Sequence, residues 1–278
     1  MKVRLLTALG IAVFGIPLLI FSEYVIYSIA LGLLSGLAAW ELLRVLGMHK
    51  KYAVSVPSIM LSALMPLFAY DYFIPAQKQT VYILIMALAI FAYLLYLAFV
   101  SVFSRGTLGY KNVASVFMAV TYVSVSFTSL ALVRYMTNGV YLFEMIFIGA
   151  WVCDSFAYFT GRLFGKHKLA PELSPKKTVE GAVGGIVFTV LAFMLYGLII
   201  ESFFGLSVNY LILAVTGLIL SVVGQVGDLW ASLIKREYGV KDYSRILPGH
   251  GGIMDRFDSI LVVSTTLLII CLLFPPFA

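Results

Sequence analysis

The sequence predicts an all-α, polytopic integral membrane protein with about nine transmembrane helices. Of its 278 residues, 62% are hydrophobic and only 12% are charged, whereas soluble domains carry about 25% charged residues. Apolar runs of roughly 20 residues, the length of a membrane span, recur along the whole chain. They lie near residues 5–21, 24–46, 53–70, 80–103, 113–135, 140–161, 181–204, 207–234 and 258–277.

The first of these runs follows two cations, as in a signal peptide, but Ser22-Glu23-Tyr24 supplies no small-residue cleavage site. We therefore expect a retained first span rather than a removed leader. The two cysteines, Cys153 and Cys271, both sit inside apolar runs, which gives no support to a disulfide framework.

The basic residues predict the orientation of the spans. With the N-terminus in the cytoplasm, only Lys78 and Arg134 of the 19 Lys and Arg residues fall in outside segments, which leaves seventeen inside. Such a bias is the positive-inside pattern of membrane proteins. It favours nine spans with a cytoplasmic N-terminus and an outside C-terminus. The net charge of +6 then reflects basic loops on one membrane face and not nucleic-acid binding.

The chain divides by chemistry into two regions. Residues 1–135 are predicted to form N-terminal transmembrane helices with short loops, serving as a lipid-facing and dimerisation bundle. Residues 140–278 are predicted to form the catalytic transmembrane region, with two large cytoplasmic loops at 162–180 and 235–257. Charges crowded at a membrane border usually mark chemistry or transport rather than packing.

Three acids border the second of these loops. Asp255 and Asp258 stand three residues apart where the last span begins, and Asp228 lies in the preceding span. A short, glycine-broken return makes the two helices antiparallel neighbours, so the three carboxylates can converge at the cytoplasmic border. Such oxygen ligands suit Mg²⁺, which typically binds one or two carboxylates together with substrate phosphates. The alternative is that the acids only cap helix N-termini.

Asp228 is followed on the same helical stripe by Ser232 and Lys235, four and seven residues later. An acid, a hydroxyl and a cation therefore line one face beside the predicted metal. The alternative is a lysine that only neutralises the acid.

A glycine-rich turn covers Leu247-Pro248-Gly249-His250-Gly251-Gly252. Glycines permit positive φ and let backbone N–H groups approach an anion, although a plain loop also needs glycines. His250 could bind a phosphate, act as an acid or base, or cap the turn.

The segment Ser174-Pro175-Lys176-Lys177-Thr178 precedes an apolar run. Serine followed by proline is a typical helix start, and a helix N-terminus beside two lysines is a ready phosphate site. The alternative is an ordinary basic cytoplasmic loop. Gly181 and Gly185, four residues apart, more often allow close helix packing than ligand binding.

Asp154 lies within a predicted span, and Tyr158 follows it on the same helical face. A carboxylate at that depth is costly and faces a polar interior. Two interpretations stay open: Asp154 binds substrate or a cation, or it holds a Lys or Arg of a neighbouring helix.

Carboxylates, lysines and an anion-binding turn on the cytoplasmic side of a bundle predict a lipid phospho- or nucleotidyltransferase. At this point the chain resembles the CDP-diacylglycerol synthases, or phosphatidate cytidylyltransferases. The resemblance covers roughly residues 150–260, including 154–158 and 174–181. Its densest anchors are Ser232, Lys235-Arg236, Lys241-Asp242, Ser244, Leu247-Pro248, His250-Gly251-Gly252, Asp255-Arg256 and Asp258.

The resemblance implies the reaction of CTP with phosphatidic acid to give CDP-diacylglycerol and pyrophosphate. It implies Mg²⁺ on Asp228, Asp255 and Asp258, a second cation (K⁺ or another divalent ion) in a paired site, and a homodimer in the cell inner membrane. Lys235 joins the three acids as a catalytic residue. The implied substrate-binding residues are Asp154, Tyr158, Ser174, Lys176, Lys177, Thr178, Ser232, Arg236, Lys241, His250, Gly251, Gly252 and Arg256.

Two other functions remain as alternatives. A CTP-dependent polyprenol or phytol kinase would transfer the γ-phosphoryl group and release CDP instead of pyrophosphate. An ion or solute transporter would carry charges near the midplane and show internal symmetry, whereas the charges here gather on one face.

The orientation gives a first prediction. In a cysteine-less background, Lys78→Cys and Asn209→Cys should react with a membrane-impermeant maleimide in intact cells, because both positions lie in predicted outside loops. Lys111→Cys and Ser174→Cys should react only after the cytoplasmic side is opened. Reversed labelling at either pair would contradict the nine-span topology.

Overall fold

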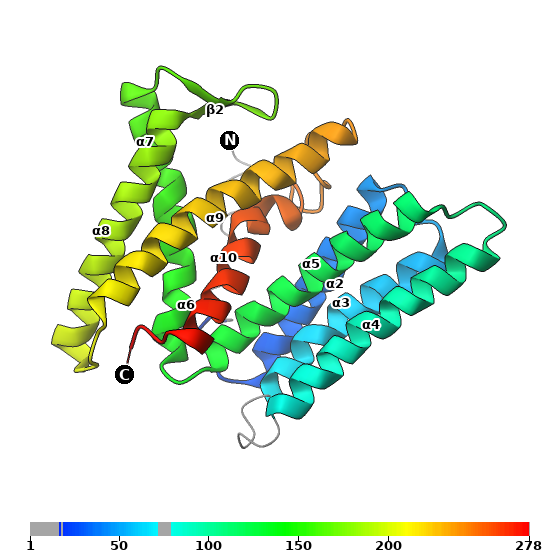
Figure 1. Ribbon diagram of the computed structural model, residues 1–278, viewed down its shortest axis with the longest axis horizontal. Coiled ribbons are helices and arrows are strands. Elements are labelled where there is room, and N and C mark those ends of the chain that lie inside the picture. The colour runs from blue at the N-terminus through cyan, green and yellow to red at the C-terminus, as the bar shows by residue number, and fades with distance from the viewer. Residues whose placement is uncertain (1–16, 18, 72–78, 278) are drawn as a thin grey trace. The chain divides into compact units, whose positions relative to one another are not determined.

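The computed structural model describes residues 17, 19–71 and 79–277 (Figure 1). Within this part of the chain, eight helices are long and apolar enough to cross a membrane, so the protein is an all-α polytopic membrane protein. They correspond to eight of the nine predicted spans. The ninth, near residues 5–21, lies almost wholly outside the described residues, so the count of nine and the orientation stay predictions.

The chain forms two compact units. The first comprises Met1–Tyr135 with Tyr238–Arg256, and the second comprises Met136–Glu237 with Phe257–Ala278. The predicted division into a lipid-facing bundle and a catalytic region stays a prediction. The charged segment Tyr238–Arg256 belongs with the N-terminal helices, however, although the sequence assigned it to the C-terminal region.

Among its described residues, the first unit contains four long helices: α2 (Val25–Val45), α3 (Tyr52–Asp71), α4 (Gln79–Phe103) and α5 (Tyr110–Tyr135). Small residues let α2 approach α3, because a β-carbon on Gly32 would meet the carbonyl oxygen of Ala63 and one on Gly36 would meet its methyl group. Such small-residue contacts drive helix association where burial from water cannot.

Side-chain hydroxyls satisfy backbone groups between these helices. Pro57 lies inside α3 and has no N–H to offer the carbonyl of Ala53 one turn earlier. The hydroxyl of Tyr96 on α4 donates to that carbonyl instead, at 2.7 Å. The hydroxyl groups of Ser58 on α3 and Tyr93 on α4 form a second hydrogen bond between these two helices, with their oxygen atoms 2.6 Å apart. In hydrocarbon, a neighbouring helix is the source of such donors.

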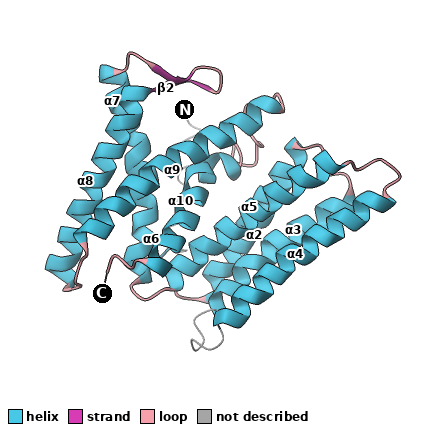
Figure 2. Cartoon of the chain, in the orientation of Figure 1, coloured by secondary structure: helices cyan, strands magenta, loops and turns pink. Residues whose placement is uncertain are grey.

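The second unit begins with one long span built of three segments: α6 (Gly139–Phe147), the π-helical turn η2 (Ile148–Val152) and α7 (Cys153–Phe164). A short hairpin follows, in which β1 (Lys168–Ala170) pairs antiparallel with β2 (Ser174–Thr178). Figure 2 shows β2 beside one end of α7. The remaining elements are α8 (Val179–Phe204), α9 (Tyr210–Glu237) and α10 (Met254–Leu273).

Glycines also bring the helices of the second unit together. A β-carbon on Gly185 of α8 would lie 2.9 Å from the carbonyl oxygen of Cys153 on α7. One on Gly217 of α9 would lie 3.1 Å from the ring of Phe193, and one on Gly227 would lie 3.1 Å from the carbonyl oxygen of Asp258. The predicted packing role of Gly181 and Gly185 is confirmed, and the helices holding Asp228 and Asp258 are neighbours as predicted.

The close approach of α2 to α3 gives a second prediction. Gly32→Ala should destabilise the protein by about 1–3 kcal/mol, the usual cost of overpacking, because the new methyl group meets backbone that cannot move aside. Melting of the purified protein in detergent should report a lower midpoint. Gly109→Ala is the matched control, since nothing lies within 4 Å of its added β-carbon; equal midpoints for the two variants would contradict the packing.

Candidate functional site

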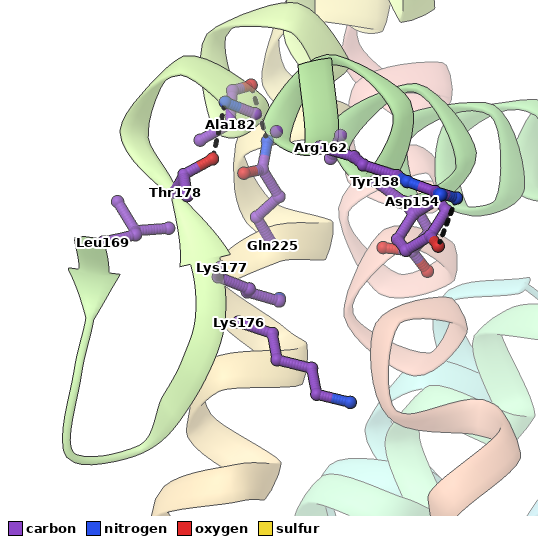
Figure 3. A pocket seen from close by; sticks show the side chains of 12 residues that line it. Asp154, Tyr158, Arg162, Leu169, Lys176, Lys177, Thr178, Ala182 and Gln225 are labelled. Atoms are coloured by element: carbon purple, nitrogen blue, oxygen red, sulfur yellow. Dashed lines mark hydrogen bonds between the residues drawn. The ribbon is translucent and has the colours of Figure 1, made fainter. Parts of the chain in front are cut away.

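A cavity of about 330 Å³ lies in the second unit, among α7, the hairpin, the start of α8 and α9 (Figure 3). The charged and hydrogen-bonding side chains that line it are Asp154, Tyr158, Arg162, Lys176, Lys177, Thr178 and Gln225.

One face of α7 supplies an acid, a phenol and a guanidinium. Asp154, Tyr158 and Arg162 follow one another at intervals of four residues, so they form one stripe. Nη1 of Arg162 donates to the hydroxyl of Tyr158 at 3.5 Å, as Figure 3 shows. The stripe begins directly after the π-helical turn, a feature that is frequent at functional sites.

The hairpin forms the facing wall and corrects the predicted helix start. Ser174 and Pro175 lie in β2, and α8 begins only at Val179. Thr178 is the N-cap residue, and its hydroxyl accepts a hydrogen bond from the N–H of Gly181 at 3.2 Å. The proline is compatible with both states, because its fixed φ suits an extended strand at a sheet edge as well as a first helical turn. The lysines therefore project from a strand and not from a helix end.

Lys176 and Lys177 both line the cavity, and Lys177 forms an ion pair with Asp228 of α9. The side chains of this pair are 26% and 27% exposed, so water screens the charges only in part. Lys176 is exposed. The predicted substrate lysines thus stand at the same cavity as Asp154, and one of them, Lys177, also contacts a second predicted acid, Asp228.

A third acid, Asp258, belongs to the same electrostatic cluster. Its carboxylate interacts with Asp228, Asp154 and Lys235, and Asp154 interacts with Asp228 and Lys177. Asp154 therefore has both a lysine and an acid near it. An arrangement of carboxylates and ammonium groups is suited to binding a divalent cation together with phosphate oxygens.

The acids do not form a closed group. Within the described residues, no three His, Cys, Asp or Glu side chains gather closely enough to hold a metal ion. The convergence of Asp228, Asp255 and Asp258 is therefore not seen, and the metal site stays a prediction. Ser232 is half-buried on α9, four residues after Asp228.

Asp255 lies in the first unit, where its Oδ2 atom accepts hydrogen bonds from the N–H groups of Tyr243 and Gly252 at 2.8 and 2.9 Å. The N–H of Gly252 is thus directed at a carboxylate of the chain itself. This differs from the expectation that Gly252 offers its N–H to a substrate anion.

The glycine-rich turn has the geometry that its sequence demands. The N–H of His250 donates to the carbonyl of Leu247 at 2.9 Å, which closes a four-residue turn around Pro248 and Gly249. Gly249 has a φ of 77°, the value required at the third position of a turn with proline second. Gly251 also has a positive φ, 86°.

The remaining predicted substrate residues lie at or near the surface. Arg236, Lys241 and Arg256 are exposed, and His250 is half-buried. The Nδ1 atom of His250 is itself buried and has no hydrogen-bond partner among the described residues. Arg236 lies in the second unit, and the other three lie in the first.

Three residues of these regions escaped the sequence reasoning: Arg162 and Gln225 at the cavity, and Glu41 of α2, which is fully buried. Arg162 shares the helical stripe of Asp154, which was the available signal. Glu41 is the one acid in the predicted span 24–46, and an acid in such a run needs partners. Gln225 had no comparable signal.

Comparison with known proteins agrees with these features. The sequence model of the cytidylyltransferase family matches residues 2–274. A phosphatidate cytidylyltransferase of Bacillus subtilis is 37% identical over 280 residues, covering 99% of this chain and 98% of the relative. One of Staphylococcus haemolyticus is 34% identical over 268 residues, covering 95% and 96%.

The cap of α8 gives a third prediction. Thr178→Ala should cost about 1 kcal/mol, the usual loss on removing an N-cap hydroxyl, whereas Thr178→Ser should retain the cap. Hydrogen exchange of the amide of Gly181 should be faster in the alanine variant alone. Ser174→Ala is the control, because Ser174 lies outside the helix; a larger effect there than at Thr178 would contradict this helix start.

Proposed function

The chain belongs to the cytidylyltransferase family, and we propose that it is a phosphatidate cytidylyltransferase. It transfers CMP from CTP to phosphatidic acid. A phosphate oxygen of the lipid forms a bond to the α-phosphorus of CTP, and the bond from that phosphorus to the β-phosphate bridge breaks. The products are CDP-diacylglycerol and pyrophosphate.

The observation that supports this proposal most directly is the cavity of the second unit, which Asp154 and Lys177 line and where Lys177 is paired with Asp228. A nucleotidyl transfer between two phosphates brings anions together. Cations must neutralise the charge on the reacting groups, and acids must hold a metal that does the same. The relatives named above carry the same activity in their names.

The nucleophile needs no strong base, because a phosphate monoester has its second pKa near about 6 and is largely anionic at neutral pH. Positioning and charge neutralisation therefore carry the reaction. Lys176, Lys177 and Arg162 line one cavity and can each bind a phosphate oxygen there. Lys235 stands near Asp258 and adds a further cation.

Asp228 and Asp258 would hold Mg²⁺, with Asp154 in reach of the same cluster. The donor set fits, because hard carboxylate oxygens are the ligands that Mg²⁺ prefers. When bound, the ion would neutralise negative charge on the phosphate groups. Asp255 fits this role less well, since its Oδ2 atom already accepts two backbone N–H groups. A second cation would occupy a paired position.

The bundle suits a lipid substrate that arrives from within the bilayer. We place the protein in the cytoplasmic (inner) membrane, with CTP entering from the cytoplasm, where the basic loops are predicted to lie. The homodimer implied by the family resemblance remains an expectation.

A fourth prediction tests the function. Purified protein in detergent, given phosphatidic acid, Mg²⁺ and α-³²P-labelled CTP, should form lipid-soluble label and pyrophosphate in equal amounts. Lipid-soluble label without pyrophosphate would contradict the proposal. In a parallel assay with γ-³²P-labelled CTP and a polyprenol in place of phosphatidic acid, release of CDP together with transfer of label to the alcohol would favour a lipid kinase.

The same assay tests the residues. Asp228→Asn and Asp258→Asn should each lower kcat by roughly 10²–10³, equivalent to about 3–4 kcal/mol of transition-state stabilisation, because each removes a negative charge without changing size. Glu172→Gln is the control, since Glu172 lies in the exposed hairpin turn away from the cavity lining. Near-normal kcat for both aspartate variants would remove these acids from the site.

A further inference from the structure

Glu41 is a fully buried acid on helix α2 of the first unit. A carboxylate within an apolar bundle is costly unless hydrogen bonds or charges compensate it. Its partners come from the segment Tyr238–Arg256 of the same unit, more than 200 residues later in the chain. This segment carries the glycine-rich turn and the first turn of α10.

Three donors converge on the Glu41 carboxylate. The hydroxyl of Ser244 donates to Oε1 at 2.6 Å, and the N–H of Ile253 donates to the same oxygen at 2.9 Å. The N–H of Met254, the first residue of α10, donates to Oε2 at 2.8 Å. N–H groups in the first turn of a helix have no partner within the helix, so Glu41 acts as a cap supplied from a distant helix.

The fit between Glu41 and this segment also explains a glycine. A β-carbon on Gly252 would overlap both carboxylate oxygens and the carboxyl carbon of Glu41. The backbone therefore has to be bare at residue 252 for the carboxylate to reach the next two N–H groups. The sequence had suggested a substrate anion as the reason for this glycine.

Asp255 binds the same segment through other donors. Its Oδ2 atom accepts the N–H groups of Tyr243 and Gly252. The successive N–H groups of Gly252, Ile253 and Met254 are thus all directed at carboxylates, the first at Asp255 and the next two at Glu41. Charge-assisted hydrogen bonds of this kind are stronger than those between neutral groups, so the backbone from 252 to 254 is held from two sides.

We propose that Glu41 is a positioning residue for the cytidylyl transfer: it fixes the segment from Ser244 to Met254 and, because Met254 begins α10, the start of the helix that carries Asp258. The proposal rests on the proposed function for the reaction that it serves. Glu41 cannot itself touch a substrate, because it has no exposed surface. It acts only through the backbone and the Ser244 hydroxyl, and small misplacement of reacting groups is enough to lower a rate by about 10²-fold.

Glu41→Gln tests this, because the side chain keeps its size but turns one acceptor oxygen into an N–H₂ donor. If the N–H₂ group replaces Oε1, it faces the N–H of Ile253, and if it replaces Oε2, it faces the N–H of Met254. In either case two donors face each other. In detergent, hydrogen exchange of the peptide containing residues 244–254 should become at least about tenfold faster, while peptides from α3 and α8 stay unchanged. In the same preparation, kcat should fall by about 10–100-fold, with KM for CTP within about threefold of wild type.

Glu23→Gln is the matched control: it removes an acid from the same unit, but one whose side chain is 71% exposed. It should change neither exchange nor kcat. Ser244→Ala serves as a second variant, should Glu41→Gln fail to fold. It should lower kcat by about 3–10-fold, and the double variant should lose less than the product of the two single losses.

Unchanged exchange at 244–254, or faster exchange there with an unchanged kcat, would overturn the proposal. So would a general loss of protection throughout the protein with normal kcat in the folded fraction, which would reduce Glu41 to a stabilising residue. A wild-type protein that makes no lipid-linked CMP would instead contradict the proposed function, and the exchange result would stand apart from it.

Discussion

Hydrocarbon offers no hydrogen bonds and does not solvate charge, so every polar group that this chain places inside a bundle must find its partner within the protein. The rule applies both to a single backbone carbonyl and to a buried carboxylate with several donors. It pairs the carbonyl of Ala53, left without a donor by Pro57, with the hydroxyl of Tyr96. It also directs two backbone N–H groups and a serine hydroxyl at Glu41. Helices and segments distant in the sequence are thereby brought to fixed positions within each unit.

Close packing at glycines makes the cavity of the second unit possible. Gly161 on α7 and Gly181 on α8 let the N-cap Thr178 approach α7, since a β-carbon on Gly161 would lie 2.7 Å from its hydroxyl oxygen. The end of β2 is therefore held against the stripe of α7 that carries Asp154. Lys177, the residue before the cap, then reaches Asp228 on α9. The glycines bind no ligand themselves in this arrangement. By letting the helices pack closely, they determine which charged side chains meet.

Sequence reasoning recovers what depends on local composition. The spans follow from runs of apolar residues, and the turn at Leu247–His250 follows from proline and glycine at set positions. It fails where several local states suit the same residues: Ser174-Pro175 begins a helix in many proteins but lies in a strand here, because pairing with Lys168–Ala170 decides the outcome. It also fails for Glu41, whose partners lie more than 200 residues away, since no short pattern encodes that contact.

The partner of a buried carboxylate indicates what that carboxylate can do. Glu41 and Asp255 accept backbone N–H groups, and such donors cannot leave without distorting the chain, so these acids are suited to holding a loop in place. Asp228 faces the ammonium group of Lys177, which stands on a flexible stem and can exchange one anionic partner for another. A carboxylate paired in this way can give up its lysine to a phosphate and accept a different cation in return. Carboxylates therefore hold a loop in place in the first unit, whereas in the second unit the proposed function would have them exchange partners during the reaction. The distinction lies in whether the donor facing the carboxylate belongs to the backbone or to a mobile side chain.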